Sequence, residues 1–84
     1  MVITFTKKLH TEDGGIREFF FNRIYTAGGI QFHVSVLNSM GELLHFNMVE
    51  KYRKWHIDKA PQPPDWVMKL EEDLNRAICQ GMLS

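Results

Sequence analysis

The feature that most constrains this fold is a change of periodicity at residues 61–64, which hold all three prolines of the chain. Before them, apolar and polar residues alternate in short runs, a pattern typical of β-strands with one buried face. After them, apolar residues recur every three or four positions, which indicates an amphipathic helix. The sequence therefore predicts an α+β fold: an antiparallel four- to five-stranded β-meander followed by one C-terminal α-helix packed on one sheet face.

The expected elements follow one another with short connections. We expect strands at about 2–9, 17–26, 30–38 and 42–50, a possible short strand at 54–58, a proline-rich linker at 61–64 and a helix at about 65–80. Gly81 is a typical residue for ending that helix. At 84 residues, the chain is short enough for these elements to form a single domain, 1–84.

The register of one hairpin is fixed by two independent features. Pairing Asn38 with Glu42 brings the apolar residues of the third and fourth strands onto one face, and a slip of one residue would invert them. The same pairing leaves a three-residue loop that ends in Gly41, which suits the left-handed conformation needed there. The resulting cross-strand pairs are Phe32–Met48, Val34–Phe46, Val36–Leu44, His33–Asn47 and Ser35–His45.

The apolar pattern changes phase after Glu50. Trp55 and Ile57 are odd-numbered, whereas the apolar residues that the fourth strand turns toward the helix are even-numbered. Either a bulge shifts the register, or residues 51–54 form a turn into a short fifth strand. We favour the turn.

The sheet face away from the helix is not cleanly polar. The three consecutive phenylalanines cannot all point inward, so either Phe20 with Ile24 or Phe19 with Tyr25 lies on the outer face. An exposed sheet face this apolar is typical of a contact surface. The candidate interaction residues on this face are Phe20, Ile24, His33, Ser35, Leu37, Leu43, His45, Asn47 and Val49.

No catalytic or metal-ligating arrangement stands out in the sequence. His33 and His45 are expected to be diagonal neighbours, but a catalytic zinc needs three protein ligands and no third lies beside them. Ser35 beside His45 has neither an orienting acid nor an oxyanion hole. Cys79 is expected near the C-terminal end of the helix, where a reactive thiolate is disfavoured. We therefore expect no enzymatic activity, no catalytic residue, no metal and no cofactor.

Composition narrows the classes of partner. Ten basic residues balance ten acidic ones, so no overall field directs the chain to nucleic acid or to an anionic membrane. The single cysteine excludes an internal disulfide, and no signal peptide or membrane-length apolar stretch is seen, which together indicate a cytoplasmic protein. The expected function is that of a small non-enzymatic interaction module. It would form a homodimer, or bind a protein partner, through its open sheet face or an edge strand.

Single-stranded nucleic-acid binding is the alternative function. Several aromatic side chains have basic neighbours, and rings that stack beside positive charge are what such binding needs. The residues concerned are Lys7, Lys8, Arg17, Phe20, Arg23, Tyr52, Arg53 and Lys54. Overall neutrality argues against this function, because attraction to phosphates supplies much of the affinity.

Overall fold

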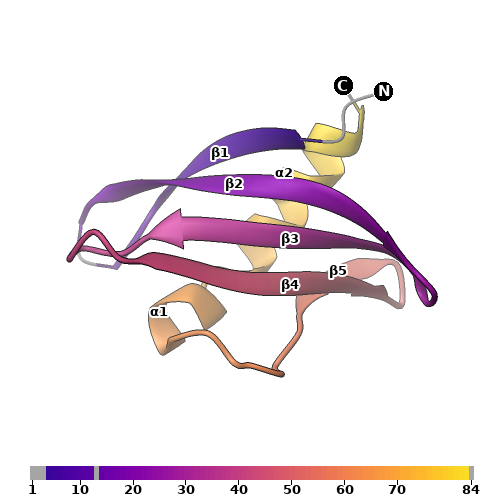
Figure 1. Cartoon of the computed structure of the whole chain (residues 1–84). Coiled ribbons are helices and arrows are strands. Elements are labelled where there is room, and N and C mark those ends of the chain that lie inside the picture. The colour runs from indigo at the N-terminus through magenta and orange to yellow at the C-terminus, as the bar shows by residue number, and fades with distance from the viewer. Residues whose placement is uncertain (1–3, 13, 84) are drawn as a thin grey trace.

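The computed structural model describes residues 4–12 and 14–83. Its elements are the strands β1 (Thr4–His10), β2 (Ile16–Thr26), β3 (Gly29–Leu37), β4 (Leu43–Lys51) and β5 (Lys54–Ile57) and the helices α1 (Asp65–Met68) and α2 (Glu71–Leu83). The five strands pair antiparallel in chain order, and α2 crosses behind the curled sheet (Figure 1). The predicted α+β meander is confirmed. Residues 2 and 3, where the first strand was expected to begin, lie outside the described residues.

The β3–β4 hairpin has the predicted register. Val34 pairs with Phe46, and Gly41 has a φ of 80°, the left-handed conformation that the three-residue loop requires. The side chain of Asn38 holds the loop, because its Oδ1 accepts hydrogen bonds of 2.9 Å from the backbone N–H groups of Met40 and Glu42. Pattern and loop chemistry therefore specify the same pairing.

The phase change after Glu50 is produced by a turn, and the fifth strand is present. β5 pairs with β4 so that Ile57 faces Met48, which returns the odd-numbered apolar residues to the inner face. The turn residues are Tyr52 and Arg53, with φ values of 54° and 65°. Left-handed backbone is unfavourable for residues with a Cβ, by about 1–2 kcal/mol each. Asn-Gly would form such a two-residue turn with less strain.

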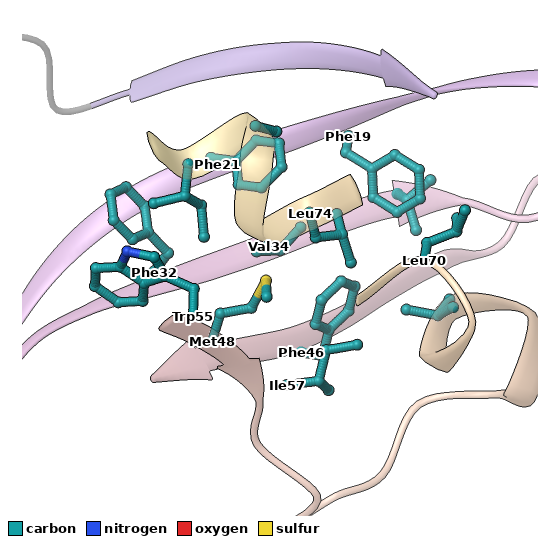
Figure 2. Packing of buried hydrophobic residues seen from close by; sticks show 14 of the residues in the cluster. Phe19, Phe21, Phe32, Val34, Phe46, Met48, Trp55, Ile57, Leu70 and Leu74 are labelled. Atoms are coloured by element: carbon teal, nitrogen blue, oxygen red, sulfur yellow. The ribbon is translucent and has the colours of Figure 1, made fainter. Parts of the chain in front are cut away.

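The core lies between the inner face of the sheet and the helices (Figure 2). The three phenylalanines alternate: Phe19 and Phe21 are fully buried, and Phe20 points to the other face. Phe21 stacks on Phe5 with a centroid distance of 4.7 Å, and Phe32 meets Trp55 edge-on at 5.0 Å. The helices contribute Val67, Leu74, Ala77 and Ile78, and the segment between the helices contributes Leu70, all buried.

The helix predicted over about 65–80 differs from the structure in two ways. It is interrupted at Lys69 and Leu70, where the Leu70 N–H donates to the Val67 carbonyl at 2.9 Å, three residues back rather than four. It also continues past Gly81 to Leu83, so Gly81 does not end it. The residue is needed for a different reason: a Cβ built on Gly81 would lie 2.5 Å from Cζ of Phe5.

Gly81→Ala is expected to destabilise the fold, although alanine is the better helix former by about 1 kcal/mol. The Phe5 ring cannot move aside freely because it stacks on Phe21 and meets Phe32 edge-on. Overpacking of this kind costs about 1–3 kcal/mol. Urea denaturation measures the difference. Adding Phe5→Leu should recover part of the loss in Gly81→Ala, and an increase in stability from Gly81→Ala alone would contradict the close packing.

Side chains of α2 cover the outer edge of β5. The outward N–H of Trp55 donates to Oδ1 of Asn75, and that of Ile57 donates to Oε2 of Glu71, both at 2.8 Å. Lys54 adds an exposed ion pair of 3.0 Å with Glu72, and this hydrogen bond and charge lower the pKa of the Glu72 carboxyl. This edge of the sheet is therefore closed to further strand pairing.

Candidate functional site

The open sheet face is the candidate functional site, because within residues 4–12 and 14–83 no helix or strand packs over it. The register places all nine candidate residues on this face: Phe20 and Ile24 from β2, His33, Ser35 and Leu37 from β3, and Leu43, His45, Asn47 and Val49 from β4. Of the two arrangements that the sequence left open, the structure has Phe20 with Ile24 outside and Phe19 inside.

An apolar patch occupies one end of this face, beside the β3–β4 turn. It consists of Ile16, Phe20, Leu37 and Leu43, whose exposed fractions lie between 38% and 59%. Leu37 and Leu43 are cross-strand partners, and Ile16, Phe20 and Leu37 line one shallow depression. We call these four residues the apolar patch. Sequence reasoning missed Ile16 because it precedes the expected strand, although it shares the even numbering of Phe20 and Ile24.

A row of hydrogen-bonded polar side chains crosses the middle of the face. His33 Nδ1 lies 2.9 Å from Asn47 Oδ1, and His33 Nε2 lies 3.1 Å from His45 Nδ1. Since an amide oxygen only accepts, His33 Nδ1 carries the proton there. When both rings are neutral, His45 Nδ1 must then donate to His33 Nε2, which leaves His45 Nε2 as an acceptor.

This polar row orders side chains but does not assemble a catalytic site. Ser35 is the cross-strand partner of His45, yet the ring hydrogen bonds of His45 and His33 run along the row to Asn47 instead. Among the described residues, no group of three or more His, Cys, Asp or Glu side chains is arranged to hold a metal ion. The arrangement can supply hydrogen bonds and apolar contact to a partner.

Two further depressions are present, and the second reaches the open face at Val49. A pocket of about 180 Å³ is lined by Thr11, Glu12, Arg17, Asn38, Ser39 and Trp66, and its volume is below the usual range for a ligand site, about 300–1,000 Å³. Within it, the Arg17 guanidinium lies 5.9 Å from the Trp66 ring centroid. A wider, open groove of about 560 Å³ runs along β5 from Tyr52 to Lys59.

The structure separates most of the residues that suggested nucleic-acid binding. Phe20 lies in the apolar patch, Arg17 lies near Trp66, and Lys7 reaches Gln80 on α2 at 3.4 Å. Tyr52, Arg53 and Lys54 remain together at the β4–β5 turn. The outer sheet face therefore does not carry a continuous aromatic and basic platform.

In comparison with known proteins, no family model, curated protein or solved structure matches this chain. Neither helix, over the part of the chain that the structure describes, is long and apolar enough to cross a membrane.

Proposed function

We propose that this protein is a small non-enzymatic interaction module that forms a homodimer through its open sheet face. The observation that supports this most directly is the apolar patch, since four large apolar side chains that are 38% to 59% exposed lie together on one face. Surface apolar residues scattered singly need no explanation, but a contiguous group is typical of a contact site. A second copy can cover it because a two-fold axis near the patch brings patch against patch.

The size of the face suits such a dimer. Strands β2 to β4 are 9 to 11 residues long. At about 3.4 Å per residue and about 4.8 Å between strands, the face of five strands measures about 700 Å². A stable interface buries about 600–1,000 Å² on each partner, so nearly all of this face would be used.

Charge on this face also permits a second copy to approach. By register, strands β2 to β4 turn two formally charged side chains outward, Glu18 and Lys51. Glu18 faces Lys8 of β1, and Lys51 lies at the end of β4 away from the apolar patch. The centre of the face is neutral, so two copies meet without repulsion between like charges. The polar row offers ring nitrogens and amides that can exchange hydrogen bonds across the interface.

The sheet edges are less favourable for association than the face. The outward N–H groups of β5 are covered by side chains of α2. β1 is the other edge, and it carries Lys7 and Lys8, which oppose pairing with another strand of this chain.

Size-exclusion chromatography with light scattering between about 1 and 200 μM tests the proposal. The unchanged protein is expected to approach twice its monomer mass of 9.9 kDa as concentration rises. Leu43→Glu should raise the dimer Kd at least about 10-fold, because it buries a charge in the apolar patch. Met82→Glu is the matched control, since Met82 on α2 is similarly exposed (47% against 52%) but lies off the face. A monomer at every concentration would refute the dimer.

A further inference from the structure

The end of the sheet opposite the apolar patch carries both tyrosines of the chain. The β2–β3 and β4–β5 turns lie side by side at this end, away from the β3–β4 turn (Figure 1). Tyr25 precedes the first of these turns and is 67% exposed, and Tyr52 lies in the second and is 96% exposed. Neither ring belongs to the buried core.

The backbone of the β4–β5 turn presents Tyr52 and Arg53 in a fixed and unfavourable conformation. Both residues have positive φ, at 54° and 65°, and neither side chain is buried. Packing therefore does not explain why these two residues occupy a turn that suits Asn-Gly. Strained backbone of this kind clusters at ligand contacts, so the strain favours a binding role for this turn.

Positive charge surrounds the two rings. Lys51, Arg53 and Lys54 flank Tyr52 in the sequence, and the guanidinium of Arg23 lies 5.7 Å from the Tyr25 ring centroid. The acidic groups at this end are Glu50 and Glu72, the second of which pairs with Lys54. Along the adjoining groove, Lys59 is accompanied by Asp58 and Glu71, so the excess of positive charge is confined to the turn.

The residues of the turn favour a nucleic-acid partner over a protein partner. Lysine is depleted at the centres of protein–protein interfaces, whereas three of the four residues 51–54 are cationic. Rings that stack on bases, beside cations that contact phosphates, are the means by which proteins hold single strands without reading their sequence. By register, Tyr25 lies on the helix side of the sheet and Lys51 lies on the open side. Strand β2 is two strand spacings from β4, about 10 Å, which one short strand that passes around the end of the sheet can span.

We propose that this end of the sheet binds single-stranded nucleic acid. Tyr25 and Tyr52 would stack on bases, and Lys51, Arg53 and Lys54 would contact phosphates. The site uses none of the residues of the apolar patch, and Lys51 is the residue that it shares with the open face. It also differs from the platform expected on the sheet face, since its residues come from the turns.

Fluorescence anisotropy of a labelled 12-nucleotide strand, at about 20 mM salt, tests this site. Binding with a Kd of tens of micromolar is expected, and three phosphate contacts predict about a 16- to 20-fold loss of affinity between 50 and 200 mM salt. Tyr52→Ala should weaken binding about 10-fold through lost stacking. Lys8→Gln, which removes one cation from β1 at a distance from the site, is the control and should change the Kd less than about 2-fold.

The double variant Tyr52→Asn with Arg53→Gly distinguishes a binding role from a structural one. It should raise the melting temperature because it relieves the left-handed strain, and it should weaken binding by at least 10-fold. Unchanged binding in this variant, no binding by the parent protein at ~100 μM, or equal displacement of the strand by polyglutamate would each overturn the proposal. Because the light-scattering test of the dimer does not involve this turn, either proposal can fail without the other.

Discussion

Phe21→Ala is expected to lower the free energy of unfolding by about 3–5 kcal/mol, the usual range for removing a fully buried phenylalanine. Phe21 has no exposed surface, stacks on Phe5 at 4.7 Å and pairs with Val34 across the strands. Its loss leaves a cavity in the core. A domain of this size has a total stability of about 4–13 kcal/mol, so the variant would be partly unfolded or close to it.

Phe20→Ala is the matched comparison, because it removes the same ring from the next residue of the same strand. Phe20 is 38% exposed and lies on the open face, so its loss should cost about 1 kcal/mol or less in the monomer. The same variant should weaken the proposed homodimer, because Phe20 belongs to the apolar patch. Urea denaturation at low micromolar concentration, followed by circular dichroism, measures both variants where association is weak.

Equal losses of stability from Phe20→Ala and Phe21→Ala would contradict the alternation of these side chains across the sheet. A loss from Phe20→Ala that appears only at high protein concentration would instead support association through the open face, because binding between copies adds to apparent stability by mass action.

The hairpin of β3 and β4 was predictable from sequence because local and long-range signals agree. Registers with an even-numbered pairing sum place Val34 and Phe46 on the same face, and the one that pairs Asn38 with Glu42 also puts Gly41 where a left-handed residue is needed. The change of phase at Trp55 left a bulge and a turn open, and the favoured turn into a short fifth strand is confirmed. Helical spacing after the prolines then provided the cover for the inner face.

Features that depend on contacts between distant residues were not predictable. The sequence left two orientations open for the three phenylalanines, because the alternation of side chains along a strand does not say which face of that strand the helix covers. Gly81 is a residue type that commonly ends a helix. Its actual role depends on its close approach to Phe5, which lies 76 positions away in the sequence. The break at Lys69 carries no proline or glycine to mark it.

The candidate site shows the same division. The nine expected residues share a face because strand alternation is a local property, and the hairpin register placed His33 opposite Asn47. The ring hydrogen bond between His33 and His45 required side-chain orientations that register does not specify. Ile16 was missed because the sequence marks strand boundaries at turns poorly. The grouping of Tyr25 and Tyr52 at one end of the sheet was also not predicted, because it depends on where two turns lie in the folded chain.

Removing the cover from the β5 edge is expected to have the second large effect. In the double variant Glu71→Ala with Asn75→Ala, the N–H groups of Trp55 and Ile57 lose acceptors at 2.8 Å. An unsatisfied buried donor costs about 1–3 kcal/mol, so the two together should lower stability by about 2–6 kcal/mol. Amide hydrogen exchange of Trp55 and Ile57 reports the change directly, and both should lose protection before the rest of β4 and β5.

Two controls separate this effect from general damage to α2. Glu71→Gln keeps an acceptor oxygen and should retain most of the protection of Ile57. Glu72→Ala removes the exposed partner of Lys54 and should have a much smaller effect, because solvent screens that pair. Full protection of both amides in the double variant would show that the hydrogen bonds from α2 do not secure this edge. If protection is lost, the exposed N–H groups provide a second route of association. The double variant should then form assemblies larger than a dimer, whereas the parent chain, with β5 covered, should stop at two copies.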